Sequence, residues 1–306
     1  MQTLPEAYQL THYDLAHLLK AELTPDTPLR LCPDLPSTVF TQIPFLQGAE
    51  HFLECLAQEP NAEIKLTSRG ALPVDYVQNI YQYSQIKEAA IESGAVKLNQ
   101  EVRSPFIRTL HFVLTRTPYA KSQHNRLSLT QSGLQWLEEK NRQRLLATLL
   151  HAYASKSLIL DAAPYSQHIE KATLWSLYML LLHRHTPLPS HYLTELLFMA
   201  QPKALGYFMP HVKPRTKEAA IALASQIYHT RIGMQFLNFF GWATASPAES
   251  NLDSIITPTP TLSACFELVL RHPLPDNFVA RISLLIQARP QRTSEQTSKT
   301  NKKRTL

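Results

Sequence analysis

Apolar side chains recur at three- and four-residue steps over most of the chain, which is the spacing of one buried helix face. In the stretch 45–58, Phe45, Phe52 and Leu56 follow this spacing, and a shorter run from Tyr13 to Ala21 has the same pattern. These stretches predict amphipathic helices, each with one face turned towards a core.

Two short stretches alternate apolar and polar residues instead, and they predict strands at 63–67 and 127–130. A helix that begins at Pro105 comes before the polar, basic stretch 117–126, and the second strand and another helix follow. This order is typical of a winged helix, in which one helix enters a DNA groove and a β-wing contacts the backbone. Pro118 lies where the first wing strand is expected, and proline cannot donate to a ladder, so we expect a poor wing hairpin.

The phrase Leu-Thr-x-x-Gly occurs twice, from Leu66 to Gly70 and from Leu129 to Gly133. Each copy joins an alternating stretch to the start of a helix, so its threonine either ends the strand or caps the helix. The two copies fit either two related small modules or two strands of one module. We favour the single module.

Leucine and aromatic residues continue at helical steps through residues 142–290, with an aromatic stripe from Phe236 to Trp242 that we assign to the core. The expected fold class is mainly α, with a winged-helix-like module (helices plus a small β-hairpin) followed by an all-helical domain. The expected parts are an N-terminal helix with a proline-rich connection (1–43), the winged-helix-like domain (44–141), the all-helical domain (142–289) and a disordered basic tail (290–306).

The composition agrees with a globular helical protein. Hydrophobic residues make up 44% and charged residues 18% of the 306 positions. The chain has only seven glycines but 22 prolines. Because tight turns and dinucleotide-binding loops need glycine, these numbers count against turn-rich β folds and glycine-rich nucleotide sites.

The cysteines and the apolar runs predict a cytoplasmic protein. Cys32, Cys55 and Cys265 are far apart and odd in number, which favours reduced thiols over a disulfide framework. The N-terminus has no basic region followed by an apolar stretch, so we expect no signal peptide. The apolar run 177–182 is far shorter than the ~20 residues of a membrane-spanning helix, so we expect no contact with a membrane.

The net charge of +6 is concentrated in two islands. Residues 97–126 and 287–306 each hold six Lys or Arg residues and one Glu, whereas the rest of the chain is acidic. The first island falls on the helix and wing that would face DNA, where cations can bind phosphates. The candidate nucleic-acid-binding residues are Arg103, Arg108, Arg116, Lys121 and Arg126. The alternative is a solvated surface whose charges serve only solubility.

Several segments together resemble a loosely defined group of uncharacterised bacterial proteins, often found on plasmids and mobile elements. They include 44–46, 64–73, 127–133, 230–241 and 256–260. The resemblance covers about residues 44–270 and implies a winged-helix-like N-terminal half. It implies no activity and no functional residues.

The residues that commonly act in catalysis or bind metal ions do not occur in a pattern that indicates an active site or a metal site. His183, His185 and His191 are close in sequence, but residues two apart on a helix point to different faces. No phosphate-binding, metalloprotease or nucleophile-elbow motif is present, so we expect no catalytic residues, metal or cofactor. We therefore predict a DNA-binding protein. The alternative is a scaffold whose helical half binds a protein partner, and an unrecognised enzyme is a weak third.

Overall fold

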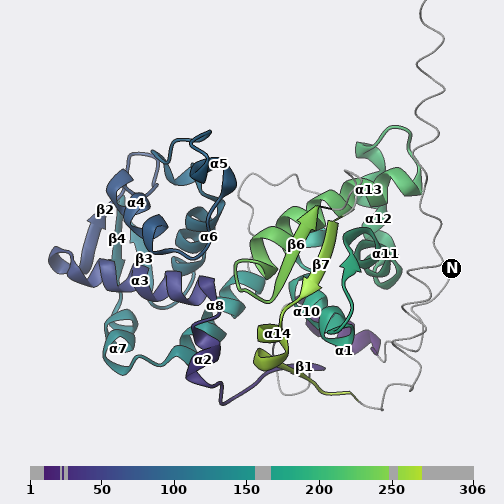
Figure 1. The fold of residues 1–306 in the computed structure, drawn as a ribbon, viewed down its shortest axis with the longest axis horizontal. Helices are drawn as coiled ribbons and strands as arrows, with labels where there is room; N and C mark the ends of the chain where they lie inside the picture. The colour runs from purple at the N-terminus through teal and green to yellow at the C-terminus, as the bar shows by residue number, and fades with distance from the viewer. Residues whose placement is uncertain (1–9, 21–22, 24–26, 156–166, 248–253, 271–306) are drawn as a thin grey trace, which may run out of the picture. The chain divides into compact units, whose positions relative to one another are not determined.

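The computed structural model describes residues 10–20, 23, 27–155, 167–247 and 254–270, which are mainly helical and include three small sheets. All helices and strands of these residues belong to the compact unit formed by residues 1–269 (Figure 1). The prediction of a mainly helical protein is confirmed. The expected disordered tail, 290–306, lies outside the described residues.

Helix α3 (Pro44–Gln58) is central to the first half of the chain. Pro44 occupies its first turn, where a missing N–H costs little, and the side chains of Phe45, Phe52 and Leu56 are fully buried. The expected helix over 45–58 is therefore confirmed. Helix α3 packs against α4 (Val74–Tyr83), α6 (Pro105–Leu114), α7 (Gln131–Glu139) and α8 (Arg142–Ser155).

Shorter helical segments complete this half. They are α1 (His12–Lys20), α2 (Ser37–Phe40), α5 (Ala89–Glu92) and the 3-10 turns η2 (Pro60–Ala62) and η3 (Glu101–Arg103). Helix α1 agrees with the helix expected near the N-terminus.

The first three-stranded sheet is antiparallel, in the order β2-β4-β3. Its strands are β2 (Glu63–Lys65), β3 (Ala120–Gln123) and β4 (Arg126–Leu129). The side chains of Ile64, Leu127 and Leu129 on one face are buried, and α3 packs against both β2 and β4. The strands predicted at 63–67 and 127–130 are confirmed within one or two residues.

The expectation of a poor wing hairpin is wrong. Pro118 lies two residues before β3, so its missing N–H falls outside the ladder, and Ala120 to Gln123 pair with β4. His124 and Asn125 connect the strands with φ of 51° and 57°. Two consecutive positive φ values make the type I′ turn that matches the twist of a hairpin.

The second half of the chain contains α9 (Gln167–Glu170), α10 (Thr173–Leu182), α11 (Ser190–Ala200), α12 (Pro202–Phe208), the turn η5 (Met209–His211) and α13 (Lys217–Tyr228). Helix α13 continues into the π-helix η6 (His229–Leu237), and α14 (Pro260–Cys265) follows later. The aromatic stripe is core, as expected, because Phe236, Phe240 and Trp242 are fully buried.

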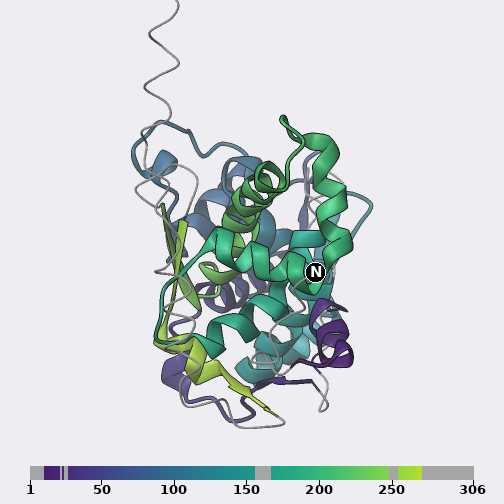
Figure 2. The ribbon, with the colours of Figure 1, turned by 90° about the vertical axis from the view of Figure 1, so that its right-hand side faces the viewer.

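This half is not all-helical, which corrects the prediction for 142–289. A second antiparallel sheet has the order β5-β7-β6, from β5 (Leu188–Pro189), β6 (Ala243–Pro247) and β7 (Ser254–Pro258). Strands β6 and β7 run side by side in both views (Figures 1 and 2). The strands are short and rich in proline, and β6 has no alternating apolar pattern. Their pairing depends on tertiary context, so periodicity could not reveal it.

Segments distant in sequence connect the two halves. Strand β1 (Leu29–Leu31) pairs with β8 (Phe266–Leu268) as a two-stranded antiparallel sheet. The Phe45 ring stacks on Phe240 with 4.7 Å between ring centroids, and the Phe45 amide donates to the Phe239 carbonyl at 2.9 Å. The first and second halves therefore share one aromatic core.

The two Leu-Thr-x-x-Gly copies have different local structures. Thr130 caps α7, because its hydroxyl oxygen accepts from the Gly133 amide at 3.1 Å. Thr67 instead closes a turn, since its hydroxyl oxygen accepts from the Ala71 amide and Gly70 has a φ of 74°. A Cβ added at Gly133 would lie 2.3 Å from the Tyr119 carbonyl oxygen, so this glycine is required by close backbone approach.

We expect Gly133→Ala to lower the free energy of unfolding by about 2 kcal/mol, because the new methyl group forces the start of α7 away from Tyr119. The matched control is Gly206→Ala in the exposed part of α12, where an added Cβ meets nothing within 4 Å. That control should raise the free energy of unfolding by about 0.5–1 kcal/mol. Urea unfolding followed by circular dichroism measures both, and an unchanged midpoint for Gly133→Ala would contradict the close approach.

Candidate nucleic-acid interface

The solvent-facing side of the β2-β4-β3 sheet gathers polar side chains from all three strands. Paired residues of an antiparallel ladder share a face, as do residues two apart on one strand. Register therefore places two rows on this face, Lys65–Arg126–Gln123 and Glu63–Ser128–Lys121. We call these six residues the wing face. Its four end residues and its central Arg126 are accessible to solvent, and its charges are three cations and one carboxylate.

The cations of the wing face differ in their partners. Arg126 Nη1 forms an ion pair with Glu63 Oε1, although 58% of the Arg126 side chain is exposed. Among the described residues, neither Lys65 nor Lys121 takes part in an ion pair, and both are exposed. With strands ~4.8 Å apart and a rise of ~3.4 Å per residue, the Cα atoms of Lys65 and Lys121 are roughly 12 Å apart. The wing face therefore presents two ammonium groups, those of Lys65 and Lys121, that form no ion pair among the described residues. Beside them lies the Arg126 guanidinium, which is paired with Glu63.

Helix α6, the helix expected to enter a groove, is buried on most of its circumference. Seven of its ten residues are buried, and it packs against α3, α4, α8 and η6. Only Pro105, Arg108 and Phe112 reach solvent, as a narrow stripe at three- and four-residue spacing. A helix covered in this way cannot lie deep in the major groove.

Arg103 and Arg108 lie near the N-terminus of α6, where the half-buried Glu88 carboxylate binds the first turn of the helix. Glu88 Oε1 accepts from the Ser104 hydroxyl at 2.7 Å and from the Phe106 amide at 3.2 Å, and burial raises the pKa of Glu88. Ser104 is the N-cap and also accepts from the Ile107 amide. Arg103 is exposed on η3, whereas Arg108 is half-buried.

Arg116 lies just beyond the other end of α6. Its guanidinium lies over the Phe112 ring, 3.1 Å from the centroid, and Nη1 donates to the Phe112 carbonyl at 3.0 Å. Burial lowers the pKa of Arg116. The residue therefore covers the C-terminal end of α6 and is only partly accessible.

The five candidate residues do not form one cluster. Arg108 lies in the first half of α6, whereas Arg116 lies beyond its C-terminal end. Register brings Lys121 and Arg126 together on the wing face, and adds Lys65, which the sequence reasoning missed. Lys65 could have been found from the alternation of 63–67, because Ile64 points inward and its neighbours must point outward.

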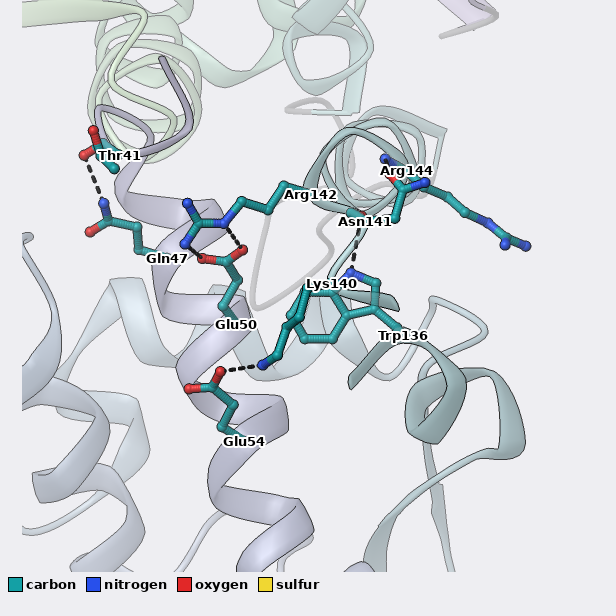
Figure 3. A network of polar contacts seen from close by, with 9 residues as sticks. All are labelled: Thr41, Gln47, Glu50, Glu54, Trp136, Lys140, Asn141, Arg142 and Arg144. Atoms are coloured by element: carbon teal, nitrogen blue, oxygen red, sulfur yellow. Dashed lines mark hydrogen bonds and ion pairs between the residues drawn. The ribbon is translucent and has the colours of Figure 1, made fainter. Parts of the chain in front are cut away.

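Two of the basic residues that follow β4, Lys140 and Arg142, are engaged in structural contacts (Figure 3). Arg142 forms a two-pronged ion pair with Glu50, with Nε–Oε1 and Nη2–Oε2 distances of 2.7 and 2.9 Å. Lys140 pairs with Glu54 and lies 5.0 Å from the centre of the Trp136 ring. Both pairs attach the connection between α7 and α8 to α3. Their charges are therefore neutralised by neighbours on α3.

We expect Arg142→Met to lower the free energy of unfolding by about 2–3 kcal/mol, because it leaves the buried Glu50 carboxylate unpaired. The matched control is Lys140→Met, whose partner Glu54 is well exposed. That change should cost less than about 1 kcal/mol, as is usual for exposed pairs. Chemical denaturation of both variants measures the difference, and equal losses would contradict this assignment.

A second polar cluster joins α3 and α4. The His51 Nε2 atom lies 2.7 Å from Asn79 Oδ1 and 3.4 Å from Cys55 Sγ, and the His51 ring stacks on Tyr83. A catalytic histidine uses one ring nitrogen towards the nucleophile and the other towards its orienting partner. Here the shortest contacts to Asn79 and to Cys55 involve the same nitrogen, and His51 Nδ1 lies 4.0 Å from Cys55 Sγ. Burial, together with Glu54 and Glu59, raises the pKa of Cys55. This arrangement does not activate the thiol.

The histidines considered as metal ligands are distributed over different elements. His183 is buried at the C-terminal end of α10, His191 lies on α11, and His185 lies between them. Within the described ranges, no group of three or more His, Cys, Asp or Glu side chains could hold a metal ion. Among the described residues, the wing face, with three cations and one carboxylate from neighbouring strands, is therefore the candidate ligand site.

No family model matches this chain, and neither curated proteins nor solved structures provide a match. Among the described residues, no helix has the length and apolar character needed to cross a membrane.

Proposed function

We propose that residues 44–141 form a winged-helix-like module that binds DNA through the wing face. The order of elements α3, β2, α4, α6, β3 and β4, with the sheet order β2-β4-β3, supports the winged-helix part of the proposal. The observation that carries the DNA-binding part is the presence of Lys65, Lys121 and Arg126 on one exposed face.

The proposed contact is with the phosphate backbone. Cations that bind phosphates give affinity without reading sequence, whereas sequence is read by side chains inside a groove. Because α6 is covered by α3, α4, α8 and η6, it is a poor candidate for groove reading. Arg103 and Arg108 form a separate, weaker candidate contact at the N-terminus of α6, and Arg116 contributes least because it packs on Phe112.

We expect the double charge reversal Lys65→Glu/Lys121→Glu to weaken binding of a labelled DNA duplex at least tenfold at low salt, because it replaces two phosphate-binding cations with carboxylates. Fluorescence anisotropy across a salt series measures this. Three phosphate contacts predict a slope of log K against log salt of about −2.7 for the native chain, reduced by about 1.8 in the variant.

The matched control is Lys203→Glu/Lys217→Glu, which changes the net charge equally at exposed positions on α12 and α13. A second control, Lys302→Gln/Lys303→Gln/Arg304→Gln, tests the basic C-terminal segment in the full chain. Equal losses from the α12/α13 reversal would mean that net charge alone attracts DNA. No binding by the native chain at low salt would reject the proposal and favour the protein-interaction alternative.

In the same experiment, we expect Glu63→Gln to strengthen DNA binding instead of weakening it. Removal of this carboxylate frees Arg126 for phosphate. Because an exposed pair is worth about 0.2–1 kcal/mol, binding should strengthen by roughly 1.4-fold to fivefold. A gain of affinity of this kind cannot come from partial unfolding.

A further inference from the structure

The β1–β8 ladder brings together two cysteines that are 233 positions apart in the sequence. The register pairs Leu29 with Leu268 and Leu31 with Phe266. One position further, Cys265 is the last residue of α14, and the Cys32 amide donates to its carbonyl at 2.8 Å, so the two backbones stay in contact at this pair. Cys32 and Cys265 are therefore opposite each other.

The type of pairing fixes their separation. At the other end of the ladder, the Val269 amide donates to the Pro28 carbonyl at 2.9 Å. Hydrogen-bonded pairs alternate along an antiparallel ladder and have Cα atoms ~5.5 Å apart. The bond from the Cys32 amide to the Cys265 carbonyl follows the same alternation at the point where α14 ends and β8 begins, so a similar Cα separation is expected there. This value lies in the range of about 4.4–6.8 Å that a disulfide spans.

We propose that Cys32 and Cys265 are a redox modification site, at which a low-molecular-weight disulfide such as oxidised glutathione converts the two thiols into a reversible intramolecular disulfide. The bridge would covalently join β1 to the end of α14. Strands β1 and β8 both pack against α10, so this bridge would hold their ends together beside that helix. The site is independent of the proposed DNA contact.

The two thiols differ in access, which sets the order of the reaction. Cys32 is half-buried, whereas Cys265 is fully buried. The Cys32 thiolate attacks the external disulfide, forming a mixed disulfide and releasing one glutathione thiol. The Cys265 thiol then loses its proton and attacks the Cys32 sulfur, releasing the second glutathione thiol. The protein loses two electrons and two protons, and oxidised glutathione is reduced to two thiols.

The environment makes this reaction slow at neutral pH. Burial, with Glu267 as a second cause, raises the pKa of the Cys32 thiol, and burial raises the pKa of the Cys265 thiol to about 12. Below these pKa values the thiolate fraction grows about tenfold per pH unit, so disulfide formation should accelerate as pH rises from 7 to 9. The third cysteine, Cys55, lies on α3, away from the β1–β8 ladder.

The test treats the full-length protein with oxidised glutathione at pH 8.5, unfolds it in acid-quenched guanidinium, and labels the remaining thiols with N-ethylmaleimide. We expect the native chain and Cys55→Ser to give a Cys32–Cys265 linked peptide by mass spectrometry, with Cys55 as the one labelled thiol of the native chain. In Cys265→Ser we expect a persistent glutathione adduct at Cys32, because no second thiol resolves it.

Three labelled thiols in the native chain would overturn the proposal, as would a persistent Cys32 adduct there. A link that involves Cys55 would also overturn it. Since the decisive measurement is made on the native chain, misfolding of a variant cannot imitate or hide the result.

Discussion

The packing of Phe45 is the contact on which the other features of this protein depend. Its ring stacks on Phe240 and meets Phe106 and Tyr153 edge-on, with centroid separations of 6.0 and 5.9 Å. These partners come from the turn after η6, from α6 and from α8. Aromatic pairs in such geometries add about 0.5–1.5 kcal/mol each beyond their buried area. One side chain at the start of α3 therefore joins elements from both halves of the chain.

The same core explains why α6 is unsuited to reading a groove. In an isolated module of residues 44–141, the side of α6 that faces Phe239 would be open to solvent. Here Phe106 on α6 meets Phe239 edge-on at 5.2 Å, and α8 and η6 complete the cover. The buried Glu101–His111 pair and the Glu88 contacts to Ser104 and Phe106 further fix the helix in place. The stability of the first half thus depends on a surface that a recognition helix would otherwise expose.

Much of the first half could be predicted from the sequence, because its elements are long or clearly periodic. The heptad-like spacing of Phe45, Phe52 and Leu56 identified α3, and the alternation at 127–130 identified β4. The second half contains strands that no local pattern marks, since β6 has the sequence Ala-Thr-Ala-Ser-Pro and β5 has two residues. These strands acquire their pairing partners only in the folded chain. Cys32 and Cys265 are brought together by the same kind of long-range pairing, which cannot be inferred from their large separation in sequence.

The charged residues of the candidate site likewise could not be placed in space from the sequence alone. Sequence identifies a basic island at 97–126, but it cannot show that its members lie at both ends of a buried helix and on a sheet. Nor can it show that the Arg142 and Lys140 charges that follow the island are satisfied by Glu50 and Glu54 on α3. Register changes the interpretation, because strand pairing places Lys65, from outside the island, directly opposite Arg126. Glu63, two residues before Lys65, forms a diagonal ion pair with Arg126. Cross-strand neighbours, rather than neighbours in sequence, determine which cations can bind the same partner. This is why the wing face is a better-defined candidate surface than the island from which it was first inferred.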